Sequence, residues 1–445
     1  MLTRPEDASA GTVDIALAIL QAANEDTKQP DPILYIQGGP AAPSIAMAPP
    51  WASSAMAENR DIIFFDRRGS HFSGQKRCPN TAFALVGDLA SDYDYDVFVE
   101  AYVGKAAACR AEMATNGYAP EDYTLARISD DLEAVRQALD LRSWNIIGHS
   151  AGGPQALHLM QRYPSTIRSV ILESATNLRA EAYGAFWFKS FARTLREVFH
   201  ECAASPTCAA VYPDPEVMLL RAVASFDEGP LELSLPAPDG TGTGRAYLNS
   251  HDLMVLLFSQ HYDAHQIPNI LRMIKAADTR DTRVFAPVAS IFTALDAMSF
   301  EGVRLSIECD HQRTVGAATA PEPADALERA LARGTPPGLL YDKVCPVFAP
   351  DMQTSSVNPD LPTAQIPVLV LTGGYDGILP PAVGKNIADG LPRASYINFR
   401  HASHQVFLPH PCAHDIGKAF FDAPLQTPSD VPCQGRMLSP FANAG

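Results

Sequence analysis

The stretch Gly148-His149-Ser150-Ala151-Gly152 restricts the fold more than any other part of the sequence. A short apolar run at 144–147 leads into it, and a segment typical of a helix follows directly. A strand that turns at once into a helix, with glycines flanking a serine, forms a nucleophile elbow that raises the serine hydroxyl above the sheet edge. The following helix start adds positive dipole there. A glycine-rich turn with an incidental serine is the alternative, and the flanking strand and helix favour the elbow.

Short apolar runs elsewhere in the chain predict the other strands of this sheet. They lie at 12–20, 32–36, 61–65, 169–173, 367–371 and 394–399. Helical patterns cover about 95–114 and 128–139, the second with Ser129 at its start. Strands that alternate with helices are typical of a mostly parallel, doubly wound sheet.

This alternation stops between residues 177 and 364. The segment contains amphipathic helical stretches, such as 187–199 and 253–258, between loops rich in proline and glycine. An insertion of this size between two strands is expected to cover the carboxyl edge of the sheet, where α/β proteins bind ligands. We therefore predict a core formed by residues 1–176 and 365–445, with residues 177–364 as a helical cap.

An acid and a base follow the last two predicted strands. Asp376 comes after the strand at 367–371, and His404 comes after the strand at 394–399. The order serine, aspartate, histidine, each after a strand, is the chain order of an α/β-hydrolase triad. His401 is the alternative base. His404 is preferred because it lies further along its loop, with room to fold back over the sheet edge.

Two further turns follow predicted strands. Glycines at Gly38 and Gly39 allow backbone N–H groups to face a ligand, as an oxyanion hole requires, although a plain turn needs no ligand. The charged turn 66–71 is interpreted as structural. His261 and His265 have the spacing of half a metal site, but no Glu or Cys lies nearby, so we predict no metal.

Composition narrows the class of protein. The 445 residues are 47% hydrophobic and 19% charged, as in an ordinary globular protein, and carry a net charge of −16. Nucleic acid is not an expected partner, because phosphate binding needs clustered Lys and Arg. No run approaches the roughly 18 apolar residues of a membrane span.

Eight cysteines point to an oxidising compartment. Their even count without a C-x-x-C pair favours disulfides over zinc. Buried thiols in a cytosolic enzyme are the alternative. The polar stretch Arg4-Pro5-Glu6-Asp7 does not resemble a signal peptide. We therefore expect a secreted or periplasmic protein whose export signal is not in this sequence. Eight cysteines allow many different connectivities, and the sequence does not choose among them. The pairs that lie closest in the sequence are Cys78 with Cys109, Cys202 with Cys208, Cys309 with Cys345, and Cys412 with Cys433.

Together these motifs resemble the α/β-hydrolases related to proline iminopeptidases and the tripeptidyl aminopeptidases of actinomycetes. The resemblance implies an α/β-hydrolase fold with a large helical cap and an exported serine hydrolase, with Ser150, Asp376 and His404 as its triad. It covers most of the chain, including the cysteine framework and the block from Leu361 to Cys433. The residues that carry it are Gly38-Gly39-Pro40, Asp66-Arg67-Arg68-Gly69-Ser70, Gly148 to Gly153, Asp376 with Pro380, and His404.

Three positions depart from the family pattern: Ala41 and His71 replace glycines, and Ala151 replaces an aromatic residue. A backbone N–H survives such replacements, so Gly39 and Ala151 are still expected to form the oxyanion hole. In these aminopeptidases, carboxylates in or near the cap bind the substrate's free amine. Glu308 and Asp310 are the candidates here because they flank Cys309, with solvated surface charges as the alternative.

The expected activity is cleavage of an amide or ester through an acyl-enzyme, with no metal or organic cofactor. The substrate is a short peptide or small molecule, and an aminopeptidase-like exopeptidase is the first choice. A carboxylesterase or amidase for a small non-peptide is the alternative that the loss of the aromatic residue favours. A catalytically silent binding protein usually lacks one triad residue, and this chain has all three. The sequence does not predict the oligomeric state.

Overall fold

The computed structural model of the chain describes residues 2–4, 7–74, 78, 92, 94–179, 187–236, 243–285, 301–316, 321–333, 340–353, 357–428, 433, 437 and 439–441. Its centre is a seven-stranded sheet in the order β11-β10-β7-β6-β4-β5-β3. Only β3 runs antiparallel to its neighbour. The strands are β3 (Leu17–Leu20), β4 (Ile33–Ile36), β5 (Ile62–Phe65), β6 (Trp144–His149), β7 (Ile167–Glu173), β10 (Val368–Gly373) and β11 (Ala394–Phe399).

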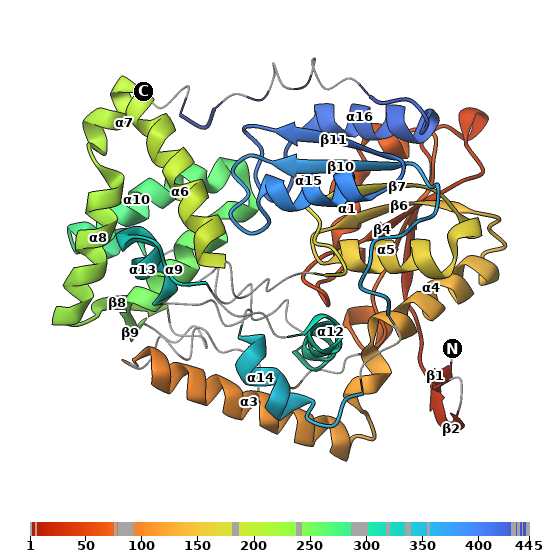
Figure 1. Cartoon of the computed structure of the whole chain (residues 1–445), viewed down its shortest axis with the longest axis horizontal. Coiled ribbons are helices and arrows are strands. Elements are labelled where there is room, and N and C mark those ends of the chain that lie inside the picture. Colours follow the sequence, from red (N-terminus) through yellow and green to blue (C-terminus); the bar gives the residue numbers. More distant parts are fainter. Residues whose placement is uncertain are drawn as a thin grey trace.

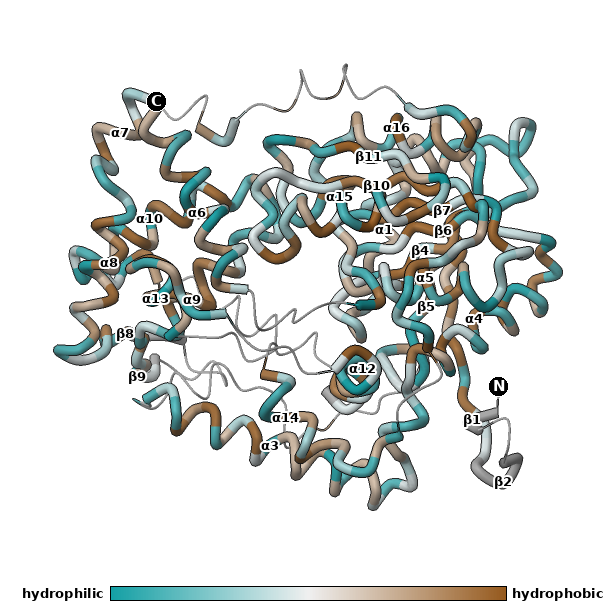
Figure 2. Tube along the Cα trace, in the orientation of Figure 1, coloured by the Kyte–Doolittle hydropathy of each residue, from teal (hydrophilic) through white to brown (hydrophobic). Residues whose placement is uncertain are grey.

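The central strands are buried on both faces, as their continuous apolar runs predict. Alternate strand residues belong to two apolar clusters on opposite faces. One cluster includes α4 (Leu125–Ala138), α5 (Gly152–Arg162) and α15 (Pro381–Gly390), and the other includes α16 (Pro411–Asp422) and the short α1 (Ala48–Trp51). The brown, apolar segments in Figure 2 accordingly coincide with β6, β7 and β10. The chain thus has the predicted doubly wound α/β architecture.

Two predicted boundaries were wrong. The strand expected at 12–20 is in fact the end of a small hairpin, formed by β1 (Leu2–Arg4) and β2 (Asp7–Thr12), followed by the separate β3. The helix expected from Ser129 begins earlier, at Leu125, because the side chain of Thr124 accepts from the N–H of Arg127 and caps the first turn. Ser129 is buried inside the helix and hydrogen-bonds with His158.

A helical lobe is inserted between β7 and β10 and stands beside the sheet (Figure 1). Its elements share one apolar cluster. They include an antiparallel hairpin, β8 with β9, that the sequence did not predict. The elements of this helical lobe are α6 (Trp187–Ala204), α7 (Pro206–Val211), α8 (Pro215–Ser225), β8 (Leu231–Pro236), β9 (Thr243–Leu248), α9 (Ser250–Ser259), α10 (Ile267–Asp278) and α13 (Ala326–Ala332).

Two other helices of the insertion lie outside the helical lobe. These are α12 (Glu301–Val315) and α14 (Tyr341–Phe348), which pack against α3 (Tyr95–Thr115), at the bottom of Figure 1. Their apolar side chains belong to the same cluster as α4 and α5. The apolar side chains of the insertion therefore pack in two places, within the helical lobe and against the core.

All eight cysteines are disulfide-bonded, in the groupings nearest in sequence: Cys78–Cys109, Cys202–Cys208, Cys309–Cys345 and Cys412–Cys433. The first anchors residue 78 to α3, and the third joins α12 to α14. Among the described helices, none combines the length and the apolar character that crossing a lipid bilayer requires.

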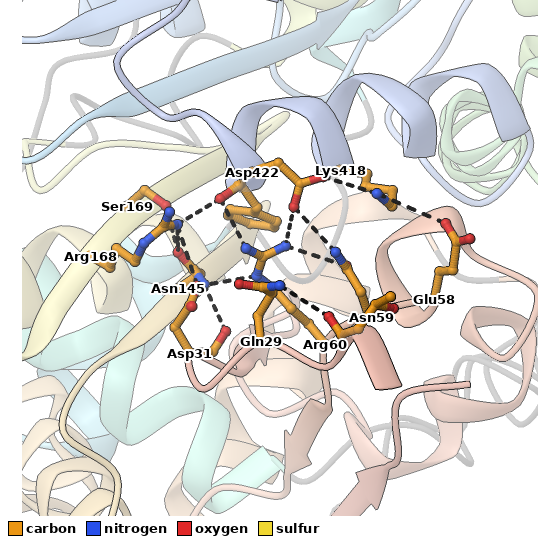
Figure 3. Close-up of polar contacts among 12 residues, drawn as sticks. Gln29, Asp31, Glu58, Asn59, Arg60, Asn145, Arg168, Ser169, Lys418 and Asp422 are labelled. Atoms are coloured by element: carbon orange, nitrogen blue, oxygen red, sulfur yellow. Dashed lines mark hydrogen bonds and ion pairs between the residues drawn. The ribbon is translucent and has the colours of Figure 1, made fainter. Parts of the chain in front are cut away.

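A polar network lies at the amino ends of the strands (Figure 3). Arg60, just before β5, donates through Nε to Asp31 Oδ2 at 3.1 Å and through Nη1 to Asp422 of α16. Asn145 at the start of β6 also donates to Asp31 Oδ2, at 2.7 Å. Because the Arg60 guanidinium is buried, these partners compensate for its lost hydration. The network fastens α16 to the end of the sheet opposite Ser150.

Candidate active site

Ser150 occupies the turn between β6 and α5 with a φ of 54°. Its N–H donates to the carbonyl of Glu173 at 3.0 Å, and its own carbonyl accepts from Gly153 N at 2.9 Å, so α5 begins at once. A Cβ at Gly152 would lie 2.2 Å from the carbonyl oxygen of Ile36, which is why only glycine fits there. A positive φ at a non-glycine residue is a strained conformation that persists mainly at functional sites. The predicted elbow geometry is therefore present.

Asp376 and His404 form a buried pair. His404 Nδ1 donates to Asp376 Oδ2 at 2.8 Å, and the two side chains are 1% and 0% exposed. The other carboxylate oxygen, Oδ1, accepts the N–H groups of Ile378 at 2.9 Å and Leu379 at 2.8 Å. With its Nδ1 proton held by the carboxylate, the imidazole carries its lone pair on Nε2. This is the tautomer that a general base requires.

The pair lies at the same sheet edge as Ser150. The ring of His404 is 5.1 Å, centroid to centroid, from the ring of His149, the residue before Ser150. His401 points elsewhere, since its Nδ1 donates to the Met437 carbonyl at 2.8 Å and its Nε2 lies 3.4 Å from Glu201 of α6. Of the two candidate histidines, His404 is thus the one paired with Asp376.

The glycine loop after β4 lies against the nucleophile. A Cβ placed on Gly38 would be 2.5 Å from Ser150 Cβ and 3.1 Å from Ser150 Oγ. Gly39 has a φ of 50°, and Ala151 directly precedes the first turn of α5. Of the two predicted oxyanion positions, Ala151 follows Ser150 directly, and Gly39 follows the glycine that packs against it.

The turn after β5 supports this glycine loop. Arg67 donates to the Gln37 carbonyl at 2.7 Å, and Asp66 Oδ1 accepts the N–H of Ser44 at 2.9 Å. The ring Nε2 of His71 donates to the Ala41 carbonyl at 3.2 Å, so two of the positions that depart from the family pattern contact each other. Burial lowers the pKa of Arg67 to about 10, against the opposing effect of Asp66. The charged turn has the structural role that the sequence indicated.

The helical lobe contacts the acid and the base directly, which the sequence did not predict. We call residues 400–407 the base loop. His261 and Tyr262, in the 3-10 turn Gln260–Tyr262, accept through their carbonyls the N–H groups of His404 at 3.1 Å and Gln405 at 3.0 Å. The ring of Tyr262 stands edge-on to His404, with centroids 5.4 Å apart, and the residue as a whole is 42% exposed. Tyr262 is thus an accessible aromatic side chain beside the base.

His261 is buried and takes part in this contact. Its Nδ1 donates to the Tyr375 carbonyl at 3.0 Å, and burial lowers its pKa to about 4. Among the described residues, no three His, Cys, Asp or Glu side chains are grouped as metal ligands. From α6, Arg193 donates to the Asp376 carbonyl at 2.9 Å.

Glu173 is a further residue near His404 that the sequence did not single out. It ends β7, and its carboxylate accepts two N–H groups of the base loop and contacts His149. The available signal was a lone carboxylate at the end of an otherwise apolar buried strand, where an unpaired charge is costly.

Glu308 and Asp310 lie on α12 and not on the helical lobe. Asp310 is buried, and Cys309 between them is bonded to Cys345 of α14. Helix α12 contacts α3, α4, α14 and the turn Pro120–Tyr123. Within the described chain, the contacts of Ser150 and His404 do not include either carboxyl group.

Comparison with known proteins identifies the class. Residues 31–212 match the family model described as alpha/beta hydrolase fold, and residues 339–433 match the model described as TAP-like protein. The chain therefore has the α/β-hydrolase fold, and its TAP-like region begins within the insertion, before α14, and continues through β10 and β11.

Individual relatives are distant. RutD of Pantoea ananatis, a candidate carbamate hydrolase, is 32% identical over 59 residues, which cover 13% of this chain and about a fifth (22%) of that protein. Among solved structures, proline iminopeptidase of Mycobacterium smegmatis has a TM-score of 0.44 and 14% identity, and covers 93% of this chain and 96% of its own. VinJ has a TM-score of 0.41 and 15% identity over 93% and 96% of the two chains.

Proposed function

We propose that this protein is a serine hydrolase that cleaves an amide or ester bond through an acyl-enzyme. Ser150 attacks the carbonyl carbon while His404 Nε2 accepts the hydroxyl proton. Asp376 holds the imidazole in this tautomer and stabilises the imidazolium. His404 then returns the proton to the leaving amine or alcohol, and a water molecule, deprotonated by the same histidine, hydrolyses the acyl-enzyme.

The oxyanion of the tetrahedral intermediate is proposed to bind the backbone N–H groups of Gly39 and Ala151. The close approach of the Gly38 main chain to Ser150 supports this assignment, because donors must lie near the attacked carbonyl. The positive end of α5 adds to the stabilisation.

The main support for the proposal is the buried Asp376–His404 pair, which lies at the same sheet edge as Ser150, a serine with a strained backbone. Removing a carboxylate and an imidazole from water costs free energy, and the positive φ of Ser150 costs about 1–3 kcal/mol more. A protein that only bound ligands on this fold would not need these three groups together. Their combination supports catalysis over silent binding.

For the substrate, we propose a short peptide or aminoacyl compound with a free amino terminus, cleaved in an exopeptidase manner. The TAP-like region and the resemblance to aminopeptidases support this choice. Residues 177–364 are proposed to act as the cap between the core parts 1–176 and 365–445. Glu308 and Asp310 remain proposed partners of the substrate amine.

A carboxylesterase or amidase for a small non-peptide is the second candidate. It is favoured by Ala151, which leaves the position after the nucleophile without the aromatic side chain of the aminopeptidases. The eight disulfide-bonded cysteines support the proposal that the protein works outside the cytosol.

The test compares Ser150→Ala with wild type on three substrates: a free aminoacyl or tripeptidyl chromogenic amide, its N-blocked form and a short-chain nitrophenyl ester. We expect Ser150→Ala to lose kcat on the order of 10⁶-fold, as in a related triad. Ser53→Ala, at an exposed serine, is the matched control and should behave as wild type. Cleavage of the free amide alone supports the exopeptidase, and cleavage of the ester alone supports the esterase. Near-normal turnover by Ser150→Ala contradicts the mechanism.

A further inference from the structure

Glu173 lies between the strands that carry the proposed nucleophile and acid. It is the last residue of β7, which pairs with β6 on one side and β10 on the other. Its side chain is 3% exposed. Carboxylate Oε1 accepts the N–H groups of Val406 and Phe407, both at 2.7 Å. These two residues follow His404 closely, so the carboxylate holds the distal half of the base loop.

The same residue contacts the nucleophile turn through its main chain. The Glu173 carbonyl accepts the N–H of Ser150 at 3.0 Å. Its second carboxylate oxygen, Oε2, lies 3.2 Å from Nδ1 of His149, whose ring faces that of His404. One residue therefore touches the elbow, its neighbouring histidine and the base loop.

The Glu173 carboxylate is ionised despite its burial. Burial acts to raise the pKa, but His149 and the two backbone N–H groups outweigh it and hold the pKa below the ordinary carboxyl value. Glu173 is thus a negative charge fixed near the base. The other titratable groups that its charge influences are Tyr35 on β4, His410 after the base loop and His414 on α16.

The helical lobe holds the two residues that precede Val406 in the same loop. The carbonyls of His261 and Tyr262 bind the N–H groups of His404 and Gln405, and Glu173 binds the two that follow. Four consecutive N–H groups, from residue 404 to 407, are therefore bound by groups from outside the loop. Three residues bind these four N–H groups, and of the three only Glu173 does so through a charged side chain, so a single substitution can remove it without altering the backbone.

We propose that Glu173 is a positioning residue of the proposed serine hydrolase, which sets the base loop against the Ser150 elbow and favours the protonated form of His404 during the reaction. The inference rests on the proposed function. It assigns to a carboxylate outside the triad both a geometric and an electrostatic effect on the base. Asp376 remains the residue that touches the imidazole.

Glu173→Gln separates the two effects. The amide oxygen of Gln can still accept both N–H groups, but the negative charge is lost. Without that charge the His404 imidazolium is less favoured, so the acidic limb of the pH profile moves to lower pH. Glu173→Ala removes the acceptor as well and frees the loop. Misplacement of a catalytic group by about 1 Å costs on the order of 100-fold in rate.

The experiment measures the rate of phosphonylation by a fluorophosphonate probe between pH 5 and 9. Ser150 Oγ attacks phosphorus, fluoride leaves, and His404 takes the serine proton, so no knowledge of the natural substrate is needed. Mass spectrometry of the wild type tests the proposed function separately, because labelling must occur at Ser150. Glu328→Gln is the matched control: Glu328 is a buried carboxylate on α13 that accepts the N–H of Ala324 at 2.8 Å.

We expect the midpoint of the acidic limb to fall by at least about half a pH unit in Glu173→Gln and to stay constant in Glu328→Gln. For Glu173→Ala, we expect a rate about 100-fold below wild type. An unshifted midpoint in Glu173→Gln overturns the inference, whatever happens to its rate. If Glu173→Ala fails to fold, the Gln variant decides alone. If the wild type is not labelled at Ser150, the proposed function fails instead.

Discussion

Gly38→Ala is the substitution whose effect is best determined by the geometry of the site. A Cβ at position 38 would lie 2.5 Å from Ser150 Cβ and 3.0 Å from the His149 carbonyl oxygen, whereas ordinary contacts begin at 3.4 Å. The glycine loop or the elbow must therefore move by most of the 0.9 Å that separates 2.5 from 3.4 Å. The neighbouring atoms include main chain, so no flexible side-chain end can relieve the contact.

This displacement separates the proposed oxyanion donor at Gly39 from the reacting carbonyl. A shift of about 1 Å costs on the order of 100-fold in rate, and loss of one oxyanion donor costs about 10²–10³ in kcat. We expect kcat to fall within this range while KM changes less than about threefold, because the donor acts chiefly in the transition state. The overpacked contact also lowers stability by about 1–3 kcal/mol.

The assay is steady-state kinetics on whichever of the three substrates the wild type cleaves best, together with thermal unfolding. Gly104→Ala in α3 is the control, since a Cβ there meets nothing within 4 Å. That variant should keep its activity and gain about 0.5–1 kcal/mol of stability, because alanine favours a helix. Wild-type kcat in Gly38→Ala would refute the assignment of the glycine loop as the oxyanion site.

Two further predictions concern the 3-10 turn Gln260–Tyr262. Tyr262→Ala removes a partly exposed aromatic residue beside His404, so kcat/KM should fall about tenfold, mainly because KM rises. Tyr262→Phe keeps the ring and should have kinetics near those of the wild type. Equal kinetics for all three proteins would show that substrate does not touch this ring. The pKa of His261 is about 4 in the folded protein, against an ordinary value of 6.5. Between these pH values the unfolded chain binds more protons than the folded protein. The free energy of unfolding therefore decreases as the pH falls from 6.5 towards 4. Urea unfolding should show a loss on the order of 2 kcal/mol from this histidine between pH 7 and 5. The total loss should be smaller by this amount in His261→Gln, because His158 and His311, whose pKa values burial also lowers, still contribute. An equal pH slope in both proteins contradicts the assignment.

Local sequence patterns were sufficient for most of the sheet and for choosing the candidate site residues. The apolar runs predict β4 to β7, β10 and β11 within a few residues, because strands buried on both faces need continuous apolar side chains. The elbow is equally local, since its glycines are required by contacts within the turn and with the neighbouring strand end. Asp376 and His404 could be selected because strand ends of a parallel sheet meet at one edge.

The contacts around the base could not be predicted in this way. In the sequence Glu173 is only the polar last residue of a strand, and its partners in the base loop are more than 200 positions away in the chain. His261 was compared with the wrong pattern, a spacing with His265, whereas its neighbour in space is the base loop. Ser129 was misplaced because a serine near an apolar periodicity resembles a cap, and only the backbone shows that Thr124 holds that position.

The two hydrogen bonds between the 3-10 turn and the base loop also bear on the order in which the candidate site is assembled. The helical lobe lies between Ser150 and Asp376 in the chain, and its carbonyls at 261 and 262 hold the N–H groups at 404 and 405. During synthesis the N-terminal part folds first, so the nucleophile turn precedes the base by most of the chain. The base loop reaches its position only after the helical lobe has folded and docked. Under the proposed mechanism, a chain whose helical lobe has not docked lacks a positioned base, so activity is expected only once folding is complete.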